Sequence, residues 1–326
     1  MKSFKYNIFS LFCIIALSVY SLTAMAGAQG YKSSSFGQCG TVTGGGNATP
    51  TLVSTASALT NALSASGSAV IIITQNIEMP YTSVKVTNKT ILALPGVKLY
   101  SNEQTASTSG ILYFKSGSNN VIMRNLTFEG PGAYDCDGRD NLCFDGATNI
   151  WVDHCDFRDG MDGNFDITQS SDFITVSWCT FAYTERAYMH QNTNLVGYSD
   201  KEPKGFLNVT YAYNHWGKGC HARMPMVRAG RIHMLCNYYD CFGNPSACIN
   251  PRMNSEVLIE GNYFADGIKK FFDTKDAEAW TWTDTNHAPS TPKSKGKVAV
   301  PYQYNAIPTD NVPTEVKAYA GATLTF

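Results

Sequence analysis

Apolar and polar residues alternate in six segments spread through the middle of the chain. The segments align without gaps over nine positions: "NVIMRNLTF" from Asn120, "NIWVDHCDF" from Asn149, "FITVSWCTF" from Phe173, "NVTYAYNHW" from Asn208, "RIHMLCNYY" from Arg231 and "EVLIEGNYF" from Glu256. The second and fourth positions are apolar, apart from Tyr211, and the ninth position is aromatic in every segment. This alternation predicts strands that bury one face.

The spacing of the segments predicts a repeating architecture. Their starts are separated by 29, 24, 35, 23 and 25 residues, and no helical pattern lies between them. A repeat of this length is typical of one structural coil. A single coil cannot bury its own apolar face, so coils stack and share one interior. We therefore predict an all-β fold, a parallel β-helix.

The seventh position indicates how the coils are held in register. It is occupied by Asn214, Asn237 and Asn262 in three successive segments. Asparagines stacked in this way predict an amide ladder inside a turn, in which each side chain bonds to the next coil. Three unrelated turn asparagines are the alternative. The same position holds Cys155 and Cys179, which we expect to be buried thiols.

The ends of the stack differ from its middle. "TPTLVSTASALTNALSAS" has helical spacing, with Ser54 or Thr55 as the N-cap, and predicts a helix that caps the open end of the β-helix. "SAVIIITQNIEM" and "KTILALPGVKLYS" predict earlier coils. After Phe264 the repeat fades, and we expect the tail, residues 265–326 with Trp280 and Trp282, to wrap one face.

The N-terminus has the features of a signal peptide, residues 1–26. Lys2 and Lys5 precede a short apolar run, and an A-x-A cleavage site ends at Ala26. The run is short for a membrane span. We therefore predict a secreted protein, extracellular or periplasmic and not membrane-bound, whose residues 27–326 form one catalytic domain.

Charge and cysteine content narrow the possible partners. Without Lys2 and Lys5 the formal charge changes from −1 to −3, which excludes the strongly basic surface of a nucleic-acid-binding protein. An anionic polymer would have to be bound by a few arginines or a metal.

Of the ten cysteines, nine remain after the signal peptide, so at least one is free. They do not form a dense disulfide framework, although export permits disulfides.

Three aspartates are candidates for a metal site. Asp140 lies 22 residues before Asp162, close to the length of one coil, and neighbouring strands are about 4.8 Å apart. Gly163 allows a bend that brings Asp166 near Asp162. Three carboxylates together repel one another unless a cation neutralises them, and oxygen ligands select a hard cation such as Ca²⁺. Turn-forming aspartates are the alternative.

Two arginines stand five residues apart in "CHARMPMVRAG". In one continuous strand, Arg223 and Arg228 would point to opposite faces. A bend at Pro225 could instead direct both to one site. His154 and Asp153, in contrast, we interpret as structural and hydrogen-bonded.

Several of these motifs together resemble the extracellular pectate lyases of polysaccharide lyase family one. They are "NIWVDHCDF", "DGNFD", "SSDFITVS" and "RMPMVRAGRIHMLCNYY", and the similarity runs from "GTVTGGGNATPTLVSTASAL" to Phe264. The resemblance implies a right-handed β-helix and calcium-dependent cleavage of polygalacturonate by β-elimination. We expect the protein to be a monomer. The resemblance implies Asp140, Asp162 and Asp166 as calcium ligands. It also implies Arg223 as the proton-abstracting base and Arg228 as a substrate contact.

The chain departs from the family pattern at one place. The family carries a lysine in an H-x-K context soon after the "TVS" strand, whereas the stretch "WCTFAYTERAYMH" offers Arg186 as its nearest basic residue. Arg186 is therefore a candidate substrate-binding residue. Three other functions stay open: a pectin lyase acting on methyl-esterified substrate without calcium, a hydrolase with paired carboxylates, and a non-catalytic β-helical glycan-binding protein.

Overall fold

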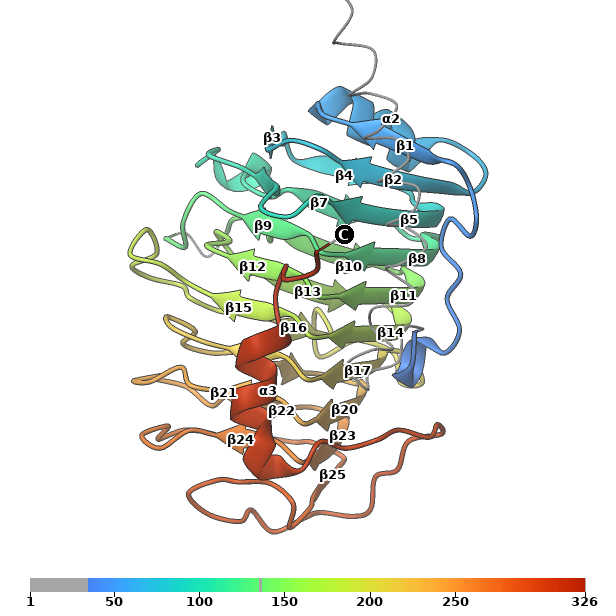
Figure 1. Cartoon of the computed structure of the whole chain (residues 1–326). Coiled ribbons are helices and arrows are strands. Elements are labelled where there is room, and N and C mark those ends of the chain that lie inside the picture. The colour runs from blue at the N-terminus through green and yellow to red at the C-terminus, as the bar shows by residue number, and fades with distance from the viewer. Residues whose placement is uncertain (1–34, 135–136, 326) are drawn as a thin grey trace, which may run out of the picture.

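The structure is a computed structural model that describes residues 35–134 and 137–325, and it confirms the predicted parallel β-helix (Figure 1). Three parallel sheets run along the stack, and nearly every coil adds one strand to each sheet. Sheet A consists of β1 (Pro50–Val53), β2 (Ala69–Ile73), β5 (Thr87–Ala93), β8 (Asn119–Arg124), β11 (Thr148–Asp153), β14 (Asp172–Ser177), β17 (Asn208–Ala212), β20 (Arg231–Leu235), β23 (Glu256–Glu260) and β25 (Ala279–Trp282).

The other two sheets are built from shorter strands. Sheet B consists of β3 (Ile77–Glu78), β6 (Lys98–Tyr100), β9 (Thr127–Glu129), β12 (Asp156–Arg158), β15 (Thr180–Ala182), β18 (His215–Trp216), β21 (Tyr238–Tyr239) and β24 (Tyr263–Phe264). Sheet C consists of β4 (Thr82–Val84), β7 (Leu112–Phe114), β10 (Leu142–Asp145), β13 (Phe165–Thr168), β16 (Leu195–Val196), β19 (Met226–Val227) and β22 (Asn250–Pro251).

Each nine-residue segment turns out to be two strands joined by a corner. Its first part lies in sheet A and its end in sheet B, and the sixth residue between them has positive φ in all six segments. These corner residues are Asn125, His154, Trp178, Tyr213, Cys236 and Gly261, with φ between 48° and 64°. The left-handed conformation is unfavourable for residues other than glycine. Only one of the six corner positions holds glycine, so the sequence pattern did not reveal the turn.

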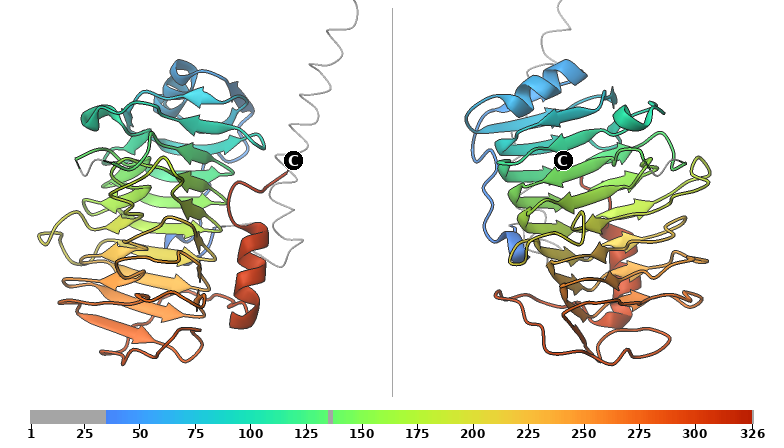
Figure 2. Two further views of the ribbon diagram at one scale, coloured as in Figure 1. Left: turned by 90° about the vertical axis from the view of Figure 1, so that its left-hand side faces the viewer. Right: turned by 180° about the vertical axis from the view of Figure 1, so that it is seen from behind.

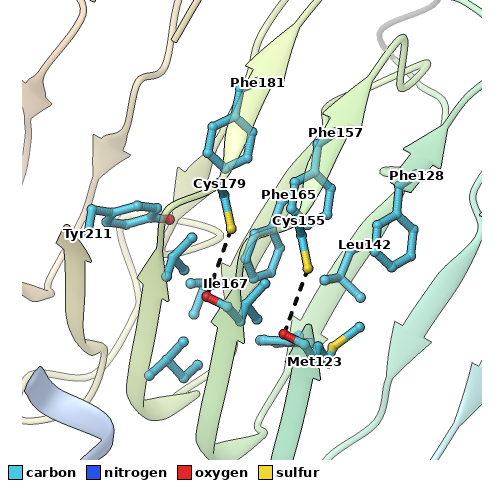
Figure 3. Packing of buried hydrophobic residues seen from close by; sticks show 14 of the residues in the cluster. Met123, Phe128, Leu142, Cys155, Phe157, Phe165, Ile167, Cys179, Phe181 and Tyr211 are labelled. Atoms are coloured by element: carbon cyan, nitrogen blue, oxygen red, sulfur yellow. Dashed lines mark hydrogen bonds between the residues drawn. The ribbon is translucent and has the colours of Figure 1, made fainter. Parts of the chain in front are cut away.

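The register of the coils follows the alignment. Ile150 pairs with Val121 and with Ile174, as the second position predicts. The ninth position forms a row of stacked rings in the interior, in which Phe128 and Phe157 lie 4.9 Å apart with parallel planes (Figure 3). Phe157 and Phe181 continue the row at 5.3 Å. Identical periodicity in every coil therefore places like side chains above one another.

The asparagine ladder is present and is longer than predicted. The side-chain oxygen of Asn237 accepts hydrogen bonds from the backbone N–H and the amide of Asn214, at 2.9 and 3.1 Å. The Asn237 amide donates to the Asn262 side-chain oxygen at 2.9 Å and to the Tyr211 carbonyl at 2.9 Å. Asn286 extends the ladder by one coil, because its side-chain oxygen accepts from Asn262.

Replacing Asn237 with alanine should destabilise the protein by about 3 kcal/mol. The change removes the hydrogen bonds that Asn237 makes to the buried backbone N–H of Asn214 and to the carbonyl of Tyr211, and each such loss costs about 1–3 kcal/mol. Urea unfolding measures the effect. Asn102→Ala is the matched control, because Asn102 is exposed and its side chain bonds, within the described ranges, only to Glu78. We expect this change to alter the free energy of unfolding by less than about 0.5 kcal/mol. Equal stability of the two variants would show that the ladder is dispensable.

A helix covers the N-terminal end of the stack, as predicted. Helix α2 (Ala56–Ser64) begins after Thr55, whose hydroxyl accepts a hydrogen bond from the backbone N–H of Ala58. It buries Leu59 and Leu63 in the interior that the coils share. Figure 1 shows α2 lying across the first coils. The helix therefore shields apolar surface that the first coil would otherwise expose.

The C-terminal tail differs in part from the prediction. Residues 279–282 form β25, which pairs with β23, and Trp282 packs in the interior. The expectation that Trp280 and Trp282 wrap one face is therefore wrong, since they add another coil. Beyond them the tail does return along the outside of the stack (Figure 2). There, α3 (Val312–Tyr319) packs Val312 and Val316 against a small cluster that includes Trp178.

Cys155 and Cys179 are fully buried thiols, as expected, and all eight cysteines in the described ranges are free and buried.

The predicted signal peptide, residues 1–26, lies outside the described residues. Within residues 35–134 and 137–325 there is no helix with the length and apolar character needed to cross a membrane.

Candidate active site

A cleft of about 270 Å³ lies over sheet C and brings together most of the predicted site residues. Its lining includes Asp140, Asp162, Asp166 and Arg223. Asp140 lies between β9 and β10, Asp162 lies between β12 and β13, and Asp166 is on β13. Arg223 lies between β18 and β19, farther along the stack. Residues far apart in sequence thus meet because successive coils place their corresponding segments side by side.

Asp140 and Asp166 point to one small space. A Cβ atom at Gly163 would lie 2.5 Å from Oδ1 of Asp140 and 3.4 Å from Oδ1 of Asp166. The carbonyl oxygen of Asn192 would be 3.6 Å from the same point. Oδ1 of Asp140 is buried and has no hydrogen-bond partner among the described residues, a situation that usually costs about 1–3 kcal/mol. An all-oxygen cradle with an unpaired buried carboxylate oxygen fits a hard cation.

Asp162 is oriented differently from the other two aspartates. Its Oδ1 is 2.7 Å from Nε2 of His190. Within the described ranges, no three His, Cys, Asp or Glu side chains are arranged closely enough to hold a metal ion by themselves. Asp140 and Asp166 therefore form the core of the candidate site. The remaining ligands of a six- to eight-coordinate ion would be a carbonyl, water, substrate or a reoriented Asp162.

The carboxylates repel one another strongly in the absence of a cation. Burial raises the pKa of Asp140 well above its usual range, the charges of Asp166 and Asp162 raise it further, and Arg223 opposes the shift. Burial also raises the pKa of Asp166 to about 7, although Arg223 and the backbone N–H of Leu195, 2.8 Å away, act in the opposite direction. A divalent cation would relieve this repulsion by taking the place of protons.

Arg223 is held by its backbone and not by its side chain. Its carbonyl oxygen accepts a hydrogen bond from Asn194 at 2.6 Å, and its φ is 58°. Among the described residues, none forms a hydrogen bond or an ion pair with its guanidinium. The cation is close enough to the aspartates to influence the pKa of Asp140 and Asp166. Arg223 is therefore a half-buried cation at the edge of the cradle, available to a ligand.

The other two predicted arginines already have protein partners. Nε of Arg228 forms an ion pair with Asp200 at 3.0 Å, and its Nη1 donates to the Gly197 carbonyl. Arg228 follows β19 and lies beside Gly197, next to Tyr198 of the cleft wall. Arg186 forms an ion pair with Glu129 at 3.2 Å and is not among the residues lining the cleft. The role predicted for Arg186 thus has no geometric support.

The most recognisable sequence motif lies away from the cleft. Asp153 is fully buried and contacts Nε of Arg124 and Nδ1 of His154, each at 2.8 Å. It also accepts a hydrogen bond from Ser177. Burial alone would raise the pKa of Asp153, but the charges of His154 and Arg124, together with hydrogen bonds from His154 and Ser177, outweigh it and lower the pKa to about 2. The structural interpretation of this pair agrees with the network.

Sequence reasoning missed several residues that line the cleft, and one residue behind it that contacts Asp162. His190, which contacts Asp162, belongs to the segment His190-Gln191-Asn192. Asparagine stands in this segment where an H-x-K motif has lysine, so the histidine of that motif was the one signal that could have located His190. Arg139 and three tyrosines also line the cleft. The tyrosines, Tyr81, Tyr113 and Tyr198, carry no motif, and only the stacking of coils brings them to one place.

Comparison with known proteins gives a consistent result. A family model described as "Pectate lyase" matches residues 4–324. Pectate lyase A of Aspergillus niger is 32% identical over 285 residues, which cover 84% of this chain and 82% of that protein. Pectate lyase plyB of Emericella nidulans is 32% identical over 249 residues, covering 72% and 70% of the two chains.

Solved structures agree on the fold. A pectate lyase from Bacillus sp. N165 in complex with trigalacturonate superimposes with a TM-score of 0.67 at 20% identity, covering 88% of this chain and 98% of that one. A pectate lyase from Paenibacillus sp. 0602 gives a TM-score of 0.68 at 16% identity, covering 90% and 97%.

Proposed function

The chain belongs to the pectate lyase family and is a polysaccharide lyase, and we propose that it cleaves α-1,4-linked polygalacturonate by calcium-dependent β-elimination, giving 4,5-unsaturated oligogalacturonides. One observation carries the proposal. The buried, partnerless oxygen of Asp140 shares a cleft with Asp166 and with an arginine that has no carboxylate partner among the described residues. This arrangement supplies a hard-cation site and a candidate base in one place.

Calcium is the cofactor that these residues would suit. Asp140 and Asp166 would hold it, with Asp162 as the third acidic residue. Bound there, the ion would neutralise carboxylates of protein and substrate and draw charge from the sugar acid as its C5 proton leaves. The substrate's own carboxylate would complete the oxygen shell, which explains why the protein supplies few ligands by itself.

Arg223 is the candidate base. It would accept the C5 proton, while a double bond forms between C4 and C5, the C4 glycosidic bond breaks, and the departing glycosidic oxygen takes a proton from water. A guanidinium is normally protonated at every physiological pH, so the proposal requires a site in which its charge is disfavoured. Neutralising Asp140 and Asp166 removes the charges that would otherwise keep the guanidinium protonated. An alkaline optimum is consistent with this requirement.

Arg228 would hold a substrate carboxylate. Its present partner, Asp200, has a side chain that is 64% exposed. Ion pairs of this kind contribute only about 0–1 kcal/mol, so a substrate carboxylate could replace Asp200 at small cost. The guanidinium would then form a forked, charge-assisted contact.

The product distinguishes this reaction from its rivals. With polygalacturonate and calcium, we expect ultraviolet absorbance from the unsaturated end to increase, and a chelator should stop the increase. Equal activity with chelator on methyl-esterified pectin would instead indicate a pectin lyase. Reducing ends that appear without absorbance would indicate a hydrolase.

We also propose that the protein acts outside the cytoplasm as a monomer. The predicted signal peptide and a polymer substrate too large to be imported support secretion. Mass spectrometry of the exported protein would test it, since cleavage after Ala26 leaves Gly27 as the first residue.

A further inference from the structure

Arg139 is an exposed arginine in the wall of the cleft, directly before Asp140. Hydrogen bonds hold both its backbone N–H and its backbone carbonyl. Its N–H donates to the hydroxyl of Ser109 at 2.9 Å, and its carbonyl accepts a hydrogen bond from Asp162 at 3.4 Å. The same segment thus positions Arg139 and the metal-site carboxylate of Asp140.

The guanidinium of Arg139 is oriented but not neutralised. Its central carbon is 5.3 Å from the centre of the Tyr81 ring, and Nε donates to the Ser107 carbonyl at 3.3 Å. Neither Nη1 nor Nη2 forms a hydrogen bond or an ion pair with another described residue. Cation–π packing and one hydrogen bond therefore hold the group while its two outer nitrogens stay available.

Most other partly exposed arginines of the stack contrast with Arg139; outside the cleft, Arg252 is the exception, because it bonds to the side chain of Asn250. Four of them are each paired with a carboxylate: Arg158 with Asp156, Arg186 with Glu129, Arg228 with Asp200, and Arg231 with Glu256. Within the cleft, Arg139 and Arg223 have no such partner in the described part of the chain. An unpaired, oriented guanidinium in a cleft is a ready site for a planar anion.

Position 110, which lies against Arg139, has room only for glycine. A Cβ atom at Gly110 would lie 2.8 Å from Cβ of Arg139, 2.6 Å from the Asp140 carbonyl oxygen and 3.1 Å from the Tyr81 ring. Beyond Tyr81 stands Tyr113, with ring centres 6.2 Å apart in an edge-on arrangement. Together these side chains form a compact, partly aromatic wall, which is typical of ligand sites.

The order of strands places this wall at one end of the cleft. In sheet C, β4 and β7 precede β10 and β13, and β19 lies beyond them. Tyr81 and Tyr113 therefore lie on the N-terminal side of the aspartates, and Arg223 lies on the C-terminal side. A linear polymer that follows the stack would meet Arg139 and the tyrosines next to the metal cradle.

We propose that Arg139, supported by Tyr81, forms a subsite for a second sugar carboxylate of the polymer, adjacent to the sugar that reacts. The subsite rests on the proposed function, because it assumes a polyanionic sugar chain in this cleft. The two outer nitrogens of Arg139 would bind both oxygens of the carboxylate. A methyl ester has no charge and cannot accept in this way, so the subsite would favour acid over ester at its position.

The test compares Arg139→Gln with Arg231→Gln, a matched control that removes one charge from an exposed, ion-paired arginine in sheet A. For Arg139→Gln we expect KM on polygalacturonate and the Kd of trigalacturonate, measured by calorimetry with calcium, each to increase about 10-fold, since one charge-assisted contact is lost. The kcat should stay within about twofold, and the Kd of methyl-esterified trigalacturonate, measured in the same way, should not change. Arg139→Lys should recover only part of the affinity, because lysine lacks the fork.

Two outcomes would overturn the subsite. One is that Arg139→Gln matches Arg231→Gln in KM and Kd, and the other is that Arg139→Gln weakens acid and ester substrates equally. Failure of the proposed function gives a different result, because wild-type protein would then make no unsaturated product. If that protein still bound trigalacturonate, and Arg139→Gln weakened the binding, the subsite would be supported and the reaction rejected.

Discussion

Replacing Arg223 with alanine is expected to lower kcat on polygalacturonate by about 10³-fold, within the range found when a general base is removed. The side chain lines the cleft beside Asp140 and Asp166, and it bonds to no other described residue. Its loss therefore leaves no buried partner unsatisfied. The backbone strain at φ 58° is similar for arginine and alanine, so the fold should be unchanged.

Circular dichroism and thermal melting would show that the Arg223→Ala fold is intact, and ultraviolet absorbance on polygalacturonate with saturating calcium would give kcat. Arg223→Lys separates geometry from basicity. A lysine that restores much of the rate would mean that any base at this position suffices, whereas an inactive lysine variant would mean that the shape and reach of the guanidine are required. Near-normal turnover by Arg223→Ala would remove Arg223 from the mechanism.

Replacing Asp140 with asparagine is expected to change stability in opposite directions with and without calcium. Without metal, the fold favours the neutral form of Asp140, because burial and the charges of Asp166 and Asp162 raise its pKa. Asparagine is neutral and of similar shape, so the metal-free variant should melt at a higher temperature than metal-free wild type. With calcium the order should reverse, since the variant would lose about 100-fold or more in affinity, and with it the stabilisation that binding provides.

The dependence on pH gives a second measurement on the same pair of proteins. A carboxylate whose folded-state pKa is raised contributes stability that is fully present below its unfolded pKa of about 3.9, and that stability is lost as pH rises through the folded pKa. For Asp166 the folded value is about 7. As the pH rises from about 4 to 7, the melting temperature of the metal-free wild-type protein should therefore fall. The melting temperature of metal-free Asp140→Asn should fall less over the same range.

Calorimetry would complete this experiment by measuring calcium affinity directly, which should weaken below about pH 7 because protons compete for the same oxygens. Asp145→Asn is the control, since Asp145 lines the cleft, but its carboxylate accepts a hydrogen bond from Tyr113. Equal calcium affinity for wild type and Asp140→Asn would place the metal elsewhere.

The strand periodicity and the register of the coils could be predicted from the sequence because both follow from local geometry. Side chains in a strand alternate with a period of two, so the apolar positions define the buried face before any coil is stacked. The same regularity predicted the ladder of Asn214, Asn237 and Asn262, whereas helical spacing predicted the capping helix, with Ser54 or Thr55 as its N-cap. Within the candidate site, the coil-length spacing of Asp140 and Asp162 was informative for the same reason.

The tertiary structure alone decided which side chains meet in the irregular segments. No period governs the loops that carry Asp162, His190 and Arg139, so their side-chain directions depend on contacts from neighbouring coils. That is why Asp162 faces His190, and why Arg228 and Arg186 have partners that the sequence did not reveal. The coil at β25 was missed for a related reason, because its strand has only four residues and too few positions to show alternation. Sequence determined the scaffold through repetition, whereas the site required the long-range packing that brings unlike loops together.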